Sequence, residues 1–227
     1  AVYDVNNTRK GPQMCSHYEA PENDRLLAGF GVAPESQMPI DLWPMYTGPF
    51  IRLQKKEAVE DGFPEFEALT GQFGLLPFWA NDRKLGRQTY NCRSETGNTK
   101  PSFRSAWKKG QKCVIPTAAF FEPDWRSGKA VPTRITRTDG GVMAVAGLWD
   151  QWKDADGQVL HSYTMLTINA DSHPFMKAFH RPNDEKRSIV ILPNGLIKDW
   201  LHSSVEQTMD FMQPYPADRL MVDNRQG

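Results

Sequence analysis

Residues 73–95, FGLLPFWANDRKLGRQTYNCRSE, change abruptly from an apolar run into a polar segment with several functional side chains. If the last six of these residues are extended, side-chain alternation places Asn91, Arg93 and Glu95 on one face. An amide, a guanidinium and a carboxylate then line one surface, which indicates a functional site. A solvated strand face with an Arg–Glu pair would give the same pattern, so the spacing alone leaves both interpretations open.

Cys15 directly follows Met14, so translation from Met14 and removal of that methionine would leave a cysteine with a free α-amine. An α-amine has a pKa of about 7.7 to 8, against about 10.4 for lysine, so a useful fraction is unprotonated near neutral pH. It can attack an aldehyde to form a Schiff base, on which the thiol closes a five-membered thiazolidine. Without that context, a lone cysteine is usually a small buried apolar residue.

Two candidates for proton transfer follow later in the chain. Glu122 lies in AAFFEP, where a carboxylate within an apolar run must be partnered or have a raised pKa. The following proline biases Glu122 towards an extended backbone. His180, in AFHRP, has the side chain best suited to proton transfer near neutrality. An exposed glutamate and a structural histidine are the alternatives that the residues alone leave open.

Several blocks of the chain resemble, in order, the signature of the SOS-response-associated peptidase (SRAP) family. The segment 90–95 is similar to the family's core motif, and the resemblance covers residues 14–222. The other blocks are FGLLPFWA at 73–80, KPSFRSAW at 100–107, CVIP at 113–116, FFEPDW at 120–125 and AFHRP at 178–182.

The resemblance implies recognition of abasic sites in single-stranded or junction DNA and a covalent thiazolidine crosslink that protects the lesion in the DNA damage response. It implies a lyase-like crosslinking activity, with self-processing peptidase activity as a second one, and neither a cofactor nor a metal. The implied catalytic residues are Cys15, Asn91, Glu122 and His180. Asn91 would orient the amine or sugar, and His180 would open the sugar and protonate the departing oxygen.

The resemblance also implies a set of DNA contacts. Arg93 would hold a phosphate beside the lesion, because a forked guanidinium fits phosphate better than lysine does. Aromatic side chains would stack on the bases that flank the gap, although core packing remains an alternative role for them. The other expected DNA-binding residues are Trp79, Phe78, His17, Arg104 and Arg181.

Three features depart from the family pattern. Residues 1–14 hold the nitrogen of Cys15 in a peptide bond, so we interpret them as an N-terminal extension that reflects a misassigned start, an added segment or a processed one. Cys15 is followed by Ser-His-Tyr instead of Gly-Arg-aromatic, which leaves His17 as a weak substitute for a phosphate-binding arginine. The blocks around Glu122 and His180 are also altered: the first lacks its flanking Gly and Trp, and the second is compressed to HRP.

Two alternative functions therefore stay open. A thiol autopeptidase would use Cys15 with His180 and Glu122 to cleave its own chain before Cys15. A non-covalent DNA-binding module with a degenerate site would bind abasic and intact single strands equally, in a salt-dependent manner.

Positive charge is concentrated around the polar segment 90–95 rather than spread over the chain. The formal net charge is zero, which counts against non-specific nucleic-acid binding as a bulk property. Residues 83–112, however, carry nine basic side chains and a single acid, Glu95. This predicts a basic groove, with an ordinary solvated face as the alternative.

The elements that must position these residues are expected to form a single domain over residues 15–227. Regular alternation of strands with long helices is missing, so we predict an α+β fold with a curved, mainly antiparallel or barrel-like sheet and peripheral helices, as in the SRAP family. Strands are expected at 46–53, 66–76, 112–116, 133–138, 142–149, 162–168, 188–192 and 219–222. Helices are expected at 102–109, after 169–172, and across 196–201 into 205–212.

The cysteines and the hydropathy pattern suggest the compartment. Cys15, Cys92 and Cys113 are odd in number and lack metal-ligand spacing, which favours a reducing environment. We find neither an apolar run long enough to span a bilayer nor the apolar core of a secretory signal. We therefore expect a cytoplasmic protein that associates with the nucleoid when bound to DNA, without a membrane or an obligatory protein partner.

Overall fold

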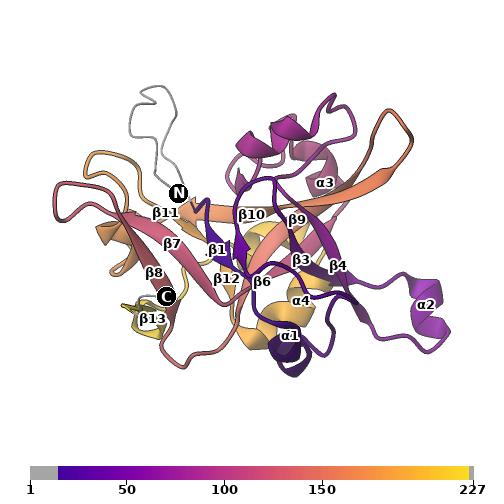
Figure 1. Ribbon diagram of the computed structural model, residues 1–227, viewed down its shortest axis with the longest axis horizontal. Coiled ribbons are helices and arrows are strands. Elements are labelled where there is room, and N and C mark those ends of the chain that lie inside the picture. Colours follow the sequence, from indigo (N-terminus) through magenta and orange to yellow (C-terminus); the bar gives the residue numbers. More distant parts are fainter. Residues whose placement is uncertain (1–14, 225–227) are drawn as a thin grey trace.

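The computed structural model describes residues 15–224 and has a barrel of five strands at its centre (Figure 1). The barrel strands are β3 (Thr47–Leu53), β4 (Phe66–Phe73), β6 (Lys112–Thr117), β9 (Met143–Lys153) and β10 (Val159–Asn169). Strand β10 pairs with both β4 and β9, and β3 and β6 connect those two, so the ring closes on itself. The pairing of β10 with β4 is parallel and the others are antiparallel.

Further strands attach to the barrel and form a second sheet beside it. Strand β5 (Asn91–Arg93) pairs parallel with β10, β11 (Arg187–Ile189) pairs antiparallel with β10, and β12 (Ile191–Leu192) pairs with β9. The second sheet has the order β13-β8-β7-β1-β2 and is antiparallel throughout. Its strands are β1 (Tyr18–Glu19), β2 (Asp41–Leu42), β7 (Ala119–Asp124), β8 (Val131–Arg137) and β13 (Leu220–Val222).

Short helices lie at the periphery. Figure 1 shows α2 projecting from the barrel on the connection between β3 and β4. Within residues 15–224, none of the helices has the length and apolar character needed to cross a membrane. The α-helices are α1 (Asn23–Phe30), α2 (Lys56–Glu60), α3 (Arg104–Lys108) and α4 (Ile197–His202). The 3₁₀ helices are η1 (Arg83–Gln88), η2 (Met176–Ala178), η3 (Asn194–Leu196), η4 (Glu206–Phe211) and η5 (Ala217–Arg219).

The two faces of the barrel wall pack into different core clusters. Along β6, Cys113 and Ile115 belong to the cluster that contains Cys15, whereas Val114 belongs to the cluster that contains Trp200 of α4. This alternation follows from the opposite directions of successive side chains in a strand. The indole Nε1 of fully buried Trp200 donates to the carbonyl oxygen of Cys113 at 2.9 Å, which fixes α4 on the barrel. The barrel wall that carries the site described below is therefore packed on both faces.

The predicted fold class is confirmed, and the differences from the expected elements have local causes. The expected helix at 102–109 forms as α3, but the segment after residue 172 makes only the single turn η2. There the ring nitrogen Nδ1 of His173 accepts the N–H groups of Phe175 and Met176, a side-chain bond that satisfies one turn and does not propagate. The expected strand at 66–76 ends at Phe73, because the next residue has a positive φ.

That next residue, Gly74, supports a prediction about stability. Its φ is +122°, and a Cβ added there would overlap the backbone carbonyl of Gly86. We expect Gly74→Ala to lower the free energy of unfolding by about 3 kcal/mol or more, because both the backbone conformation and the contact oppose a side chain. Urea unfolding measures the effect.

The matched control is Gly29→Ala in α1, where nothing lies within 4 Å of an added Cβ. Alanine is the better helix former by about 1 kcal/mol, so this variant should be unchanged or slightly stabilised. Equal unfolding midpoints for the two variants would contradict the structural role assigned to Gly74.

Candidate active site

Strand pairing between β1 and β7 places Cys15. Tyr18 pairs with Phe120, and the backbone N–H of Phe121 donates to the carbonyl oxygen of His17 at 3.0 Å. Continuing this antiparallel register brings the chain before β1 alongside Glu122. Cys15 is consequently buried, with 1% of its surface exposed, and its thiol donates to the carbonyl oxygen of His17 at 3.6 Å.

Asn91 and Glu122 hold the backbone of Cys15 from two sides. The side-chain amide of Asn91, at the start of β5, donates to the carbonyl oxygen of Cys15 at 2.9 Å. The carboxyl group of Glu122 accepts a hydrogen bond from the Cys15 backbone. Among the described residues, Asn91 Oδ1 and Glu122 Oε2 are buried without a hydrogen-bond partner. Unsatisfied buried polar atoms are rare in folded proteins, so their pairing around one cysteine indicates a functional site.

Glu122 and His180 form the second pair of the site, with 3.6 Å between Glu122 Oε2 and His180 Nε2. Burial raises the pKa of Glu122 well above its ordinary value, and the bond from Cys15 opposes this only in part. Burial lowers the pKa of His180. Both shifts favour the uncharged forms of the two groups, a protonated acid beside a neutral imidazole.

The tautomer and backbone of His180 are also defined. Its Nε2 lies 3.1 Å from the carbonyl oxygen of Arg187, and because a carbonyl only accepts, this nitrogen carries the proton. The backbone of His180 has φ +64°, an unusual value for a residue other than glycine, and its N–H donates to the carbonyl oxygen of Pro123 at 2.9 Å. The bond to Pro123 holds this strained residue beside β7, next to Glu122.

The thiol of Cys15 is kept in its protonated form. Burial raises the pKa of Cys15 well above its ordinary value, and nearby Glu122 adds to the effect. Tyr90 packs against the same cluster, and burial, with Cys15 and Glu122 as lesser causes, raises its pKa to about 12. Tyr90 immediately precedes Asn91, yet its place at the site was missed, because its polar neighbours in the sequence, Gln88, Thr89 and Asn91, give no sign that its ring is packed beside Cys15.

Arg93 and Glu95 enter an ionic chain rather than one strand face with Asn91. Strand β5 ends at Arg93, whose Nη1 donates to Glu185 Oε2 at 2.6 Å. Glu185 Oε1 in turn accepts from buried Arg187 at 2.9 Å, and Arg187 binds both oxygens of Glu95 at 2.8 Å. The expected common face is therefore wrong for Glu95. Glu185 and Arg187 were missed, although the charged triplet EKR directly before the apolar run 188–192 was a usable signal.

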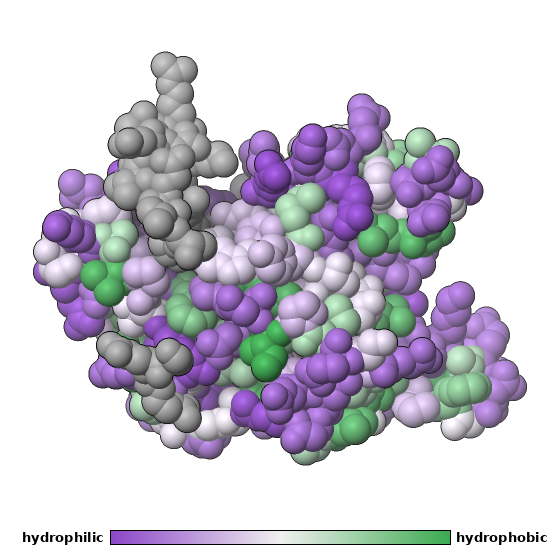
Figure 2. Space-filling model, viewed as in Figure 1, coloured by the Kyte–Doolittle hydropathy of each residue, from purple (hydrophilic) through white to green (hydrophobic). Residues whose placement is uncertain are grey.

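The aromatic candidates lie on the surface of the loop before η1. Phe78 and Trp79 are 69% and 43% exposed, unusually high values for large apolar side chains. The indole Nε1 of Trp79 donates to the carbonyl oxygen of Pro101 at 3.4 Å, which joins this loop to the segment before α3. At the upper right of Figure 2, where Figure 1 places α3, many hydrophilic residues surround a few hydrophobic ones. Exposed rings beside a charged surface suit base stacking.

The basic segment is mostly solvent-facing, with one correction. Lys112 is buried at 4% exposure; its Nζ donates to the carbonyl oxygens of Ser203 and Ser204 and lies 4.8 Å from the Trp200 ring centroid. Burial lowers its pKa to about 8. Lys112 therefore stabilises the packing of α4 and contributes nothing to a groove. The exposed members are Arg83, Lys84, Arg87, Lys100, Arg104, Lys108 and Lys109.

Two other expected DNA contacts have protein partners. The His17 ring is stacked between Trp43 and Phe121, with centroids 4.0 and 3.9 Å away, and its Nε2 pairs with Asp41. Because its Nε2 already pairs with the Asp41 carboxylate, His17 is a poor substitute for a phosphate-binding arginine and is not among the DNA contacts proposed below. Arg181 is exposed, with its guanidinium 5.0 Å from the Trp125 ring centroid. Within residues 15–224, no group of three or more His, Cys, Asp or Glu side chains is arranged to hold a metal ion.

Comparison with known proteins identifies the family of this chain. A model of the SOS response associated peptidase (SRAP) family matches residues 6–224, and the chain belongs to that family. It is 33% identical over 153 residues to "Abasic site processing protein YoaM" of Bacillus subtilis (strain 168), covering 65% of this chain and 63% of the relative. It is 23% identical over 227 residues to "Abasic site processing protein HMCES" of Xenopus tropicalis, covering 90% and 63%. The matches thus span less than two thirds of these relatives.

Solved structures show the same fold. A crystal structure of a protein from Bordetella bronchiseptica has a TM-score of 0.83 and 46% identity, covering 92% of this chain and 98% of that one. A second, from Bacteroides thetaiotaomicron, has a TM-score of 0.73 at 19% identity, covering 92% and 90%. At such low identity the second likeness concerns the fold alone.

Proposed function

We propose that this protein processes abasic sites in DNA, and that it does so by capturing the lesion covalently through Cys15. The names of its relatives support the first part. The observation that carries the second is the hydrogen bond between the Cys15 backbone and the buried carboxyl of Glu122. If residues 1–14 are absent from the active form, the nitrogen of Cys15 is an α-amine and Glu122 lies directly beside it.

The proposed chemistry uses each group of the site once. The α-amine adds to the C1′ aldehyde of the ring-opened abasic sugar, and loss of one water gives an imine. The thiol then adds across the C=N bond: sulfur bonds to the carbon, and the thiol proton ends on the ring nitrogen. Glu122, rather than the His180 that the resemblance implies, supplies as a protonated acid the proton that the departing oxygen needs, because the Nε2 proton of His180 is bonded to the carbonyl oxygen of Arg187. His180 supports opening of the sugar. Asn91 holds the carbonyl of Cys15 so that nitrogen and sulfur face the same carbon.

The proposed partner is single-stranded or junction DNA that contains an abasic site. In this proposal Arg93 would hold a phosphate next to the lesion, Trp79 and Phe78 would stack on flanking bases, and Arg104 and Arg181 would contact the DNA backbone. The protein would act in the cytoplasm, on the nucleoid. This setting is consistent with its three unpaired cysteine thiols.

The test is a denaturing gel of the chain that begins at Cys15, mixed with an oligonucleotide whose single uracil has been excised. We expect a band of slower mobility that survives heating, and none with the intact oligonucleotide. Equal binding to both strands without a covalent band would instead support the non-covalent module. The chain with residues 1–14 attached should form no adduct, because its nitrogen is an amide.

The thiol autopeptidase is the weaker alternative. Peptidase cysteines act as thiolates, and their pKa values are lowered by neighbouring cations. In this site the pKa of Cys15 is raised by burial and by Glu122. Thiazolidine formation tolerates a protonated thiol better, because the nucleophile of its first step is the amine.

A further inference from the structure

The proposed phosphate ligand Arg93 already has an anionic partner. Its Nη1 lies 2.6 Å from Glu185 Oε2, and the two side chains are 40% and 33% exposed. Charge-assisted bonds of this length are among the stronger hydrogen bonds in proteins. A DNA phosphate that approaches Arg93 must therefore compete with a carboxylate that is present before the DNA arrives.

Glu185 is held in place by contacts other than Arg93. Its second oxygen, Oε1, accepts from Arg187 Nη1 at 2.9 Å and from the side-chain amide of Asn169 at 3.2 Å. Arg187 is itself buried and bound to both oxygens of Glu95. If Arg93 turns towards DNA, the Glu185 carboxylate can thus stay on Arg187 and Asn169, close to the incoming phosphate.

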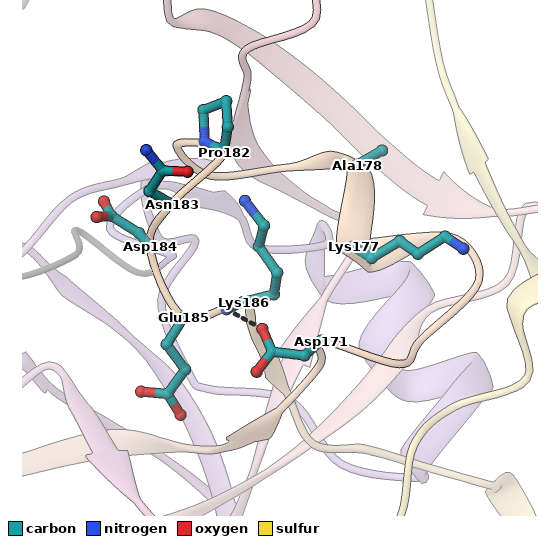
Figure 3. A pocket seen from close by; sticks show the side chains of 8 residues that line it. All are labelled: Asp171, Lys177, Ala178, Pro182, Asn183, Asp184, Glu185 and Lys186. Carbon is teal, nitrogen blue, oxygen red and sulfur yellow. Dashed lines mark hydrogen bonds between the residues drawn. The ribbon is translucent and has the colours of Figure 1, made fainter.

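The loop that carries Glu185 is anchored from its opposite side. Residues 181–186 connect His180 to β11, and residues 182–186 border an open cavity of about 610 Å³. Figure 3 shows the side chains of Glu185 and Lys186 leaving this loop in opposite directions. The Lys186 ammonium binds the carbonyl oxygens of His180 and Arg181, and its backbone N–H donates to Asp171 Oδ1 at 2.8 Å. These bonds keep Glu185 directed at Arg93.

We propose that Glu185 is a specificity-determining residue that competes with DNA phosphate for Arg93. The inference rests on the proposed function and adds to it a reason for selectivity. The four charges of Arg93, Arg187, Glu95 and Glu185 cancel, so this edge of the site attracts ordinary DNA weakly. Covalent capture at an abasic site then compensates for the weak phosphate contact, whereas an intact strand has no such compensation.

The experiment measures binding of an intact fluorescent single strand to the chain beginning at Cys15, across a series of salt concentrations. Glu185→Gln keeps the size of the side chain and removes its charge, and we expect it to bind roughly 3- to 10-fold more tightly, the range for a partly exposed ion pair. The plot of log affinity against log salt should also steepen by about 0.7, one further phosphate contact. In wild type, a phosphate contact at Arg93 should release no net counterion. The cation that the phosphate gives up is offset by one that Glu185 binds once it has lost Arg93.

Two further variants isolate the contact. Asp184→Asn removes one negative charge from the same loop, where no ion pair of Asp184 is found among the described residues, and it should leave affinity within about twofold of wild type. In an Arg93→Ala background the gain from Glu185→Gln should vanish. Thermal unfolding checks that each variant folds.

The outcomes separate this inference from the proposed function. An unchanged affinity and salt slope in Glu185→Gln, or a gain that persists without Arg93, would overturn the inference, and wild-type crosslinking would still stand. A missing wild-type adduct together with the expected Glu185→Gln gain would overturn only the covalent chemistry. Failure of wild type and Glu185→Gln to bind any single strand would overturn the inference as well.

Discussion

Cys15→Ala, in a chain that begins at residue 15, should form no heat-stable adduct with an abasic oligonucleotide. Alanine keeps the α-amine and can still form an imine, but an imine without a neighbouring thiol hydrolyses back to amine and aldehyde. The stable product depends on the sulfur that closes the ring. A denaturing gel after heating, with and without borohydride, measures both species: we expect a band for the alanine variant only when borohydride has reduced the imine.

Serine and a second cysteine provide the controls. Cys15→Ser should behave like the alanine variant, because a hydroxyl is a much weaker nucleophile than a thiol towards the imine carbon. Cys92→Ala removes a thiol that is buried in the other core cluster, so its adduct should match wild type. A heat-stable adduct in Cys15→Ala without borohydride would refute the thiazolidine.

Glu122→Gln should slow adduct formation by about 10²- to 10⁴-fold, the usual contribution of a general acid. The amide has nearly the same shape and can still accept the bond from the Cys15 backbone, but it has no proton to give. The pseudo-first-order rate at saturating oligonucleotide is the measurement. Glu60→Gln, on exposed α2, is the matched control and should react at the wild-type rate. A Glu122→Gln rate within a few-fold of wild type would remove Glu122 from the mechanism.

The raised pKa of Glu122 also predicts a pH dependence. The folded protein holds this proton more tightly than the unfolded chain, so the group's contribution to stability is complete below its unfolded pKa and is lost as pH rises through the folded value. The rate of adduct formation should fall over the same pH range, because only the protonated form of Glu122 can donate a proton. The α-amine loses its proton as pH rises, which increases the rate. The wild-type rate should therefore pass through a maximum as pH rises. The falling limb should disappear in Glu122→Gln.

Local sequence was sufficient to predict burial and secondary structure where a residue's environment is set by its immediate neighbours. Glu122 sits among apolar residues, and it is buried with a raised pKa as that context predicts. The adjacent proline favours extended backbone, and β7 is a strand there. The long strands and α3 followed in the same way from alternation and helix-forming residues. These features depend on residues a few positions apart.

The ionic chain at the edge of the site could not be predicted, because it joins side chains some 90 positions apart. Arg93 meets Glu185, and Glu95 meets Arg187, only after β11 pairs with β10 beside β5. The prediction that Lys112 belongs to a basic groove was wrong for a related reason. Its neighbours in sequence are basic, whereas its hydrogen-bond partners come from the turn after α4. Charge counted along the chain shows where cations are concentrated and not which of them are already bound.

The most direct test of the central claim is the mass of the product formed by the chain beginning at Cys15 and an abasic oligonucleotide. We predict a species equal to the sum of the two components less one water. After denaturation and alkylation, Cys92 and Cys113 should be modified and Cys15 should not, because its sulfur lies in the ring. A product of the same mass in which Cys15 is alkylated, or recovery of both components unchanged, would contradict covalent capture by the amine and thiol of one residue.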